Sequence, residues 1–133
     1  MADIRIFNVP ALGTPMGQYS HVSRVKASET LFIAGQVGAR ADGTVLETFE
    51  AQVAQAFANT YAALQACGAG WANVVQFRTY LVHSQDIPRF MEYRLREFPG
   101  MFRGSPYPPN TLLMIDRLVK ESLLFEVETV AAL

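Results

Sequence analysis

The chain has 133 residues, a formal net charge of −1 and a sequence pI of 6.1. This length predicts a single domain over residues 1–133, large enough to bury one hydrophobic core. Half of the residues are hydrophobic and only 17% are charged, which indicates that part of the surface packs against another subunit. The charge balance lacks the basic excess of proteins that bind phosphates, so we expect no nucleic-acid partner.

Targeting signals and cysteines narrow the class of protein further. No segment approaches the roughly 18 consecutive apolar residues of a membrane span, and residues 1–13 lack the apolar core of a signal peptide. Cys67 is the single cysteine, so no disulfide framework exists and a reducing compartment fits. We therefore expect a cytoplasmic protein with no membrane contact.

The first third of the chain predicts three strands. Residues 4–8 (IRIFN) form a short strand-like stretch that ends before Pro10. Residues 21–26 and 30–36 are two further strand-like runs. Only the short segment ASET lies between them, which favours a hairpin.

A helix of about five turns is predicted from Thr48 to Cys67, because apolar side chains recur there at every third or fourth position. These positions are Phe49, Val53, Phe57, Tyr61 and Leu64. Thr48 is suited to cap the N-terminus, and Gly68 to end the helix. Cys67 would lie at the end of this helix, where we expect an inert buried thiol rather than a nucleophile.

The second half of the chain predicts one more helix between strands. Residues 73–82 alternate as a strand does, with Val75, Phe77 and Leu81 on one face. Asp86 is placed to cap a helix that has Pro88 in its first turn and ends at Pro99-Gly100. Two last strands are expected at residues 111–116 and 123–132.

This order of elements predicts an α+β domain of two layers, because two helices can cover only one face of a mixed sheet of about six strands. The other face would carry polar side chains among apolar neighbours: Gln76, Arg78, Tyr80, Glu126 and Glu128. Such a mixture is too apolar for free solvent and too polar for a core. It is typical of an interface between subunits.

Motifs for the common kinds of chemistry are missing. The chain contains no phosphate-binding GxxxxGK[ST] loop and no GxSxG nucleophile elbow. His21 and His83 are 62 positions apart, without cysteines or carboxylates at ligand spacing, so we expect no metal site.

Glu126 and Glu128 are the most suggestive carboxylates. Two residues apart on one strand, they project from the same face about 6–7 Å apart. On a partly apolar face, one of them could have a raised pKa and act as an acid or base. Alternatively, each pairs with an arginine across a subunit boundary. Arg78 is interpreted as such an ion-pair partner rather than as a ligand clamp.

Two other segments carry candidate binding residues. Tyr19, in GQYSH, is either a wall of a binding site or an anchor for its own loop. The segment PYPPNT (106–111) stiffens the approach to a strand, because prolines restrict the backbone and lack a donor. This rigidity would hold the side chain of Asn110 in a fixed place.

Several of these motifs together resemble the YjgF/RidA family. The matching segments are Gly17-x-Tyr19-Ser20-His21, LFIAGQVG (31–38), AQVAQAFANTYAALQACGAG (51–70), NVVQFRTYLV (73–82) and FEVETVA (125–131). The resemblance implies a chorismate-mutase-like α+β fold and a homotrimer whose sheets form a central barrel, with ligand clefts between subunits. It also implies a deaminase-like hydrolase that acts on a small-molecule imine or enamine without metal or cofactor.

Carried over position by position, the resemblance assigns ligand-binding places to Tyr19 and Gly35, and the catalytic place to Glu126. The family pattern P-A-R-[ST] stands here as Pro108-Pro109-Asn110-Thr111. Asn110 thus replaces the arginine that binds the substrate carboxylate, and it has no charge with which to do so.

Two neighbouring positions also depart from the family pattern. Ala34 stands for a serine, and Leu112 for a cysteine of some members. We therefore expect a ligand without the usual carboxylate anchor, bound by a hydrolase or by a non-catalytic regulatory trimer. A third interpretation has another arginine reach the cleft, for which Arg24, Arg78 and Arg103 are the candidates.

Overall fold

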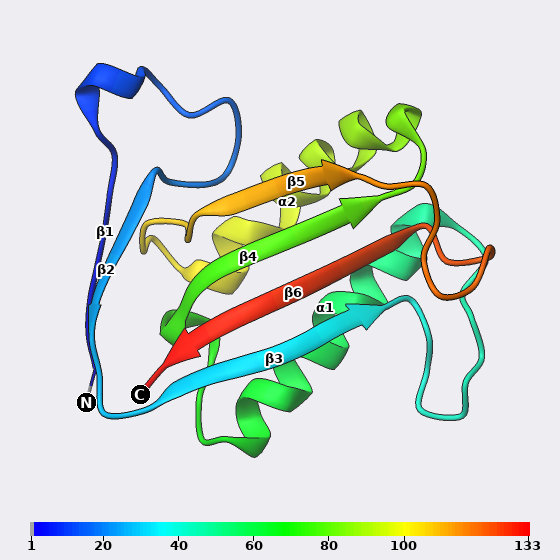
Figure 1. Ribbon diagram of the computed structural model, residues 1–133, viewed down its shortest axis with the longest axis horizontal. Coiled ribbons are helices and arrows are strands. Elements are labelled where there is room, and N and C mark those ends of the chain that lie inside the picture. Colours follow the sequence, from blue (N-terminus) through cyan, green and yellow to red (C-terminus); the bar gives the residue numbers. More distant parts are fainter. Residues whose placement is uncertain (1) are drawn as a thin grey trace.

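Both helices of the protein cover one face of a four-stranded sheet in the computed structural model, which describes residues 2–133 (Figure 1). The helices and strands are β1 (Asp3–Phe7), β2 (Val22–Lys26), β3 (Thr30–Val37), α1 (Phe49–Ala66), β4 (Val74–Leu81), α2 (Ile87–Phe102), β5 (Asn110–Met114) and β6 (Phe125–Ala132). Short 3-10 turns occupy residues 10–12, 71–73 and 84–86. The α+β two-layer prediction is confirmed.

The main sheet has the strand order β3-β6-β4-β5. β6 pairs antiparallel with β3 and β4, and β4 pairs parallel with β5. The last strand in sequence therefore lies inside the sheet, between β3 and β4. The six strands predicted are present, but β1 and β2 form a separate antiparallel ribbon.

The predicted hairpin between residues 21–26 and 30–36 is wrong. β2 pairs with β1, from Asp3↔Lys26 to Phe7↔Val22, while β3 pairs with β6. The connection between β2 and β3 is fastened to the C-terminus, because the Ser28 and Glu29 amides both donate to the Leu133 carbonyl. Pairing with β6 also lets Ile33 join the core, which a local hairpin would not achieve.

Helix α1 begins and ends where the sequence predicts. The Thr48 hydroxyl accepts a hydrogen bond of 3.1 Å from the Ala51 amide, and Gly68 has a positive φ of 73°. Cys67 is exposed, contrary to the prediction of a buried thiol. It follows the last helical residue, beyond the buried stripe of α1, whose last member is Leu64.

Helix α2 extends beyond the Pro99-Gly100 pair that was expected to end it. The last turn continues to Phe102, and the Arg103 amide, at a φ of 46°, donates to the Pro99 carbonyl. Pro99 removes one hydrogen bond from the helix. Burial of Phe98 and Phe102 on the same stripe holds this turn against the sheet and offsets that loss.

An aromatic cluster fills the space between the helices and the sheet. Phe57 of α1 is at its centre, with ring centroids 5.6 Å from Phe77, 5.6 Å from Tyr93 and 5.8 Å from Phe98. Phe125 of β6 lies 6.0 Å from the same ring. These rings come from both layers, so they fix α1 and α2 relative to the strands.

The other face of the main sheet has no helix over it (Figure 1). We call this the open face. Phe32 on β3 is 80% exposed there and pairs with Val130, while Arg78, Tyr80, Glu126 and Glu128 are partly exposed. Within residues 2–133, no helix combines the length and the apolar composition needed to span a membrane.

Candidate functional site

Glu126 lies on the open face, directly beside Gly35. Strand β6 alternates so that Phe125 and Val127 are buried under the helices while Glu126 faces the other way. A Cβ atom at Gly35 would overlap the Glu126 carboxylate and lie 2.9 Å from its Cγ. Only glycine leaves room for Glu126 in this position. The structure thus brings together two of the residues that the sequence singled out.

Glu126 and Glu128 differ in their partners. The Tyr80 hydroxyl donates a hydrogen bond of 2.7 Å to Glu128, and Arg78 Nη1 lies 3.6 Å from the same carboxylate. Glu128 and Arg78 are therefore a pair within one chain. Burial raises the pKa of Glu126, and the nearby negative charge of Glu128 raises this pKa further. Within residues 2–133, no hydrogen-bond donor offsets this rise.

Asn110 lies on the opposite side of the sheet from Glu126. It is the first residue of β5 and is in register with Phe77, whose side chain is in the core. The Asn110 Nδ2 group donates 3.2 Å to the Thr79 hydroxyl, while Oδ1 is buried without a partner in residues 2–133. Leu112, two residues further, packs against the core. Within one chain, Asn110 and Glu126 therefore do not share a site.

Tyr19 is half-buried in the loop between β1 and β2, which packs against α2. Its hydroxyl accepts a hydrogen bond of 3.2 Å from the Met16 amide, so it also anchors its own loop. A Cβ atom at Gly17 would lie 2.6 Å from the Met91 methyl group of α2. This close approach seats the loop on the helix.

Of the three candidates for a replacement arginine, only Arg78 lies on the open face with Glu126. Arg24 is exposed on β2, where it pairs in register with Arg5. Arg103 is exposed just after α2, and Arg78 is engaged with Glu128. Ala34 is exposed on β3, and its carbonyl accepts a hydrogen bond from the Gln36 amide group.

Arg94 on α2 is a buried cation that the sequence analysis missed. It is 2% exposed, and its guanidinium carbon lies 4.7 Å from the Phe90 ring centre and 5.9 Å from that of Tyr19. Nη2 contacts the Met91 sulfur at 2.9 Å, while Nε and Nη1 are buried without a partner in residues 2–133. Burial lowers the pKa of Arg94 to about 10, so it stays charged at neutral pH.

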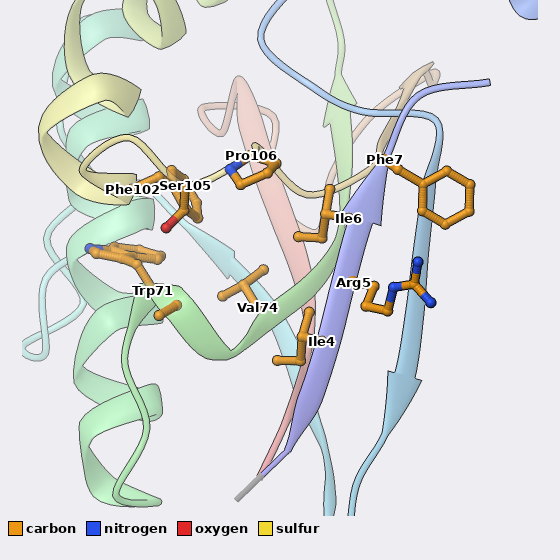
Figure 2. A pocket seen from close by; sticks show the side chains of 10 residues that line it. Ile4, Arg5, Ile6, Phe7, Trp71, Val74, Phe102, Ser105 and Pro106 are labelled. Atoms are coloured by element: carbon orange, nitrogen blue, oxygen red, sulfur yellow. The ribbon is translucent and has the colours of Figure 1, made fainter. Parts of the chain in front are cut away.

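A cavity of about 420 Å³ lies away from all of these residues, between β1 and the end of α2. Ile4 and Ile6 point into it toward Trp71 and Val74, whereas Arg5 points away (Figure 2). Ser105 and Arg5 also line this cavity, but no carboxylate or histidine is among its lining residues. A carboxyl group suited to acid-base chemistry is found instead at Glu126.

Across residues 2–133, no three side chains of His, Cys, Asp or Glu gather closely enough to hold an ion. His21 instead serves the fold, since its Nδ1 accepts a hydrogen bond of 3.0 Å from the Val9 amide.

The fold and the paired residues Gly35 and Glu126 define a class: small α+β domains whose sheet leaves one face open. The family described as Endoribonuclease L-PSP matches residues 11–133. The chain belongs to this family, the YjgF/RidA family.

Two curated relatives and two solved structures illustrate the likeness. A 2-iminobutanoate/2-iminopropanoate deaminase from Dermatophagoides farinae is 27% identical over 100% of this chain and 99% of its own. The RutC family protein YjgH of Escherichia coli is 27% identical over 86% of this chain and 83% of its own. The Rid family protein YyfB of Yersinia pestis, of unknown function, has a TM-score of 0.86 at 30% identity, covering 98% of both chains. RidA from an Antarctic Psychrobacter has a TM-score of 0.71 at 27% identity, covering 90% of this chain and 92% of its own.

Proposed function

We propose that the protein hydrolyses the C=N bond of a small-molecule imine or enamine without a metal or cofactor. The observation that carries this proposal is the Glu126 carboxyl, which lies unpaired beside Gly35 with a raised pKa. A general acid or base works best when its pKa approaches the working pH. The full-length similarity to an imine deaminase supports the same reaction type.

The reaction needs one group that first accepts and then gives a proton. Water adds to the carbon of the protonated imine, which forms a carbinolamine while Glu126 takes a proton from the water. The protonated carboxyl then returns this proton to the nitrogen. As the C–N bond breaks, the hydroxyl proton passes to Glu126, a carbonyl compound forms, and ammonia leaves with that proton as ammonium. One carboxyl with a raised pKa supplies both steps.

The proposed cleft lies between subunits of a homotrimer, where the open face of one chain meets the next. Gly35 and Glu126 come from one subunit, and Tyr19 and Asn110 from its neighbour, because Glu126 lies on the open face of its own sheet and Asn110 on the helix side. Since Asn110 is neutral, the polar end of the ligand is not a carboxylate held from β5. Loss of such a charged pair weakens binding by about ten- to hundredfold.

The assay uses freshly generated 2-aminoacrylate, which tautomerises to 2-iminopropanoate, together with an uncharged imine. Glu126→Gln is expected to abolish turnover of whichever compound the wild type hydrolyses, while leaving the fold intact. Glu92→Gln, on the exposed side of α2, is the matched control and retains activity. Unchanged turnover in Glu126→Gln rules out the acid-base role.

The alternative is a metabolite-binding regulatory trimer without catalysis, which the neutral side chain at Asn110 favours. It predicts that neither imine is hydrolysed faster than in buffer, although ligands still bind. An arginine-containing relative serves as the reference. If the wild type hydrolyses 2-aminoacrylate as fast as that relative, the view that Asn110 disfavours such substrates is wrong.

The homotrimer is tested by sedimentation. Wild-type protein is expected to sediment as three chains of 14.7 kDa. Phe32→Glu places a charge on the exposed apolar part of the open face and is expected to release monomers. Leu95→Glu, on the exposed side of α2, leaves the trimer intact. A monomeric wild type contradicts the proposed assembly.

A further inference from the structure

Arg94 stands out because its charge is buried and, among the described residues 2–133, no carboxylate pairs with it. Two of its guanidinium nitrogens have no hydrogen-bond partner in residues 2–133, and the third contacts only the Met91 thioether, a weak acceptor. The rings of Phe90 and Tyr19 give partial compensation, since a cation over an aromatic face contributes about 0.5–2 kcal/mol. Burial of an unpaired charge costs more than this. A structural role alone does not explain the residue.

The sheet that α2 packs against also holds an unpaired polar group, the Oδ1 atom of Asn110. Phe90 and Phe98, one turn before and after Arg94, contact Phe125 at 5.0 Å and Phe77 at 6.0 Å. Arg94 therefore belongs to the stripe of α2 that faces the sheet, and Thr79 lies two residues after Phe77 on the same face of β4. Thr79 is the partner of Asn110, whose Oδ1 is buried and unpaired.

The Asn110 amide can serve as donor or acceptor toward this space. In its present orientation, Nδ2 donates to Thr79 and Oδ1 is free to accept from an N–H group. A half-turn of the amide would let the Thr79 hydroxyl donate to Oδ1 and would free Nδ2 as a donor. Arg94 on α2 and Asn110 at the start of β5 thus each keep free hydrogen-bonding capacity within residues 2–133.

The loop that carries Tyr19 and the side chain of Met91 lie against Arg94. Gly17, Tyr19 and Met91 are all partly exposed, and together they cover the guanidinium of Arg94. Met91 is unbranched and changes rotamer easily. Movement of its side chain would uncover Nη2 without displacing the helix.

We propose that Arg94 is the anion anchor of the ligand site: its guanidinium binds a carboxylate that enters between α2 and the start of β5, beside Tyr19 and Asn110. This inference rests on the proposed reaction and revises its expected ligand: the charge missing from Asn110 is supplied from α2, so an imine that carries a carboxylate is no longer disfavoured. A guanidinium binds a carboxylate through two parallel hydrogen bonds, and such charge-assisted bonds are among the strongest in proteins.

The test measures binding by calorimetry, independently of turnover. The probes are 2-oxobutanoate, a carboxylate, and its neutral amide, 2-oxobutanamide. Wild-type protein is expected to bind the carboxylate about ten- to hundredfold more tightly than the amide. In Arg94→Met this preference disappears. Arg96→Met removes an exposed arginine from the same helix and keeps the preference.

Two further measurements separate anchoring from a structural role. Without ligand, Arg94→Met is expected to unfold at the wild-type temperature or above it, because an unpaired buried charge has been removed. Arg94→Lys keeps the charge without the fork and binds 2-oxobutanoate with intermediate affinity. In wild-type protein, the Arg94 Nε–H signal in NMR spectra shifts on addition of the carboxylate and not of the amide.

The inference is overturned if wild-type protein shows no preference for the carboxylate, or if Arg94→Met retains it. A lower unfolding temperature in Arg94→Met with the preference retained assigns Arg94 to the fold. Because these experiments measure binding and not turnover, their outcome does not depend on the proposed catalytic role of Glu126. Selective binding without hydrolysis would keep the anchor and reject the proposed catalysis.

Discussion

Gly35→Ala tests whether glycine is needed to accommodate Glu126. The added methyl group would overlap the Glu126 carboxylate and approach its Cγ to 2.9 Å. The carboxylate can rotate away, but Cγ is close to the backbone of β6 and has less freedom. Overpacking of this kind costs about 1–3 kcal/mol. We expect the free energy of unfolding to fall by that amount, and turnover to fall with it.

A double-mutant cycle isolates this contact. Glu126→Ala removes Cγ, Cδ and both carboxylate oxygens, so the second substitution, Gly35→Ala, should then cost less than about 0.5 kcal/mol. Urea unfolding of the four proteins at one protein concentration gives the coupling energy, since assembly makes stability depend on concentration. Gly70→Ala is the control, because its backbone is extended and its Cβ would contact nothing within 4 Å. Equal costs of Gly35→Ala in both backgrounds would refute the proposed packing.

Three other perturbations have defined outcomes. Glu126→Gln should be more stable than wild type at pH 7, because a raised folded-state pKa means that ionisation of Glu126 destabilises the fold. Thermal unfolding from pH 4 to 8 measures the difference in stability between the two proteins. This difference should vanish as the pH falls below 4.5, the ordinary pKa of glutamate. Gly38→Ala should cost more than Gly35→Ala in urea unfolding, because its methyl group would overlap the α1 backbone at Gln52, which cannot rotate away. Gln52→Leu should cost at least about 3 kcal/mol in the same assay, because the Leu46 and Ser122 carbonyls and the Leu124 amide lose the hydrogen bonds that the Gln52 side chain makes to them. A cost under 1 kcal/mol would contradict this structural role of Gln52.

Local patterns were sufficient for most individual elements. Apolar spacing, with Thr48 before it and Gly68 after it, predicted the bounds of α1 within a residue. Alternation along residues 125–131 placed Glu126 and Glu128 on the face away from the helices. Both results depend on periodicity and capping, which act over a few neighbouring residues.

Local sequence patterns could not predict which strands pair when those strands are distant in the sequence. The segment ASET predicted a hairpin, yet β2 and β3 belong to different sheets because β3 gains more burial beside β6. Pro99 was expected to stop α2, but buried aromatic residues on both sides of it carry the helix on to Phe102. In each case, tertiary packing outweighed a local preference.

The sequence by itself determined the composition of the candidate site: a glycine and a glutamate kept, and an asparagine where the resemblance implies an arginine. Only the tertiary structure decided that Glu126 and Asn110 lie on opposite faces of one sheet, because strand register sets the direction of each side chain. It alone also showed that Arg94 is buried with two guanidinium nitrogens unpaired among the described residues 2–133, since burial depends on the neighbours that α2 meets across the layer. Position 110 of β5 thus lacks the positive charge that the resemblance implies, while Arg94 on α2 carries one.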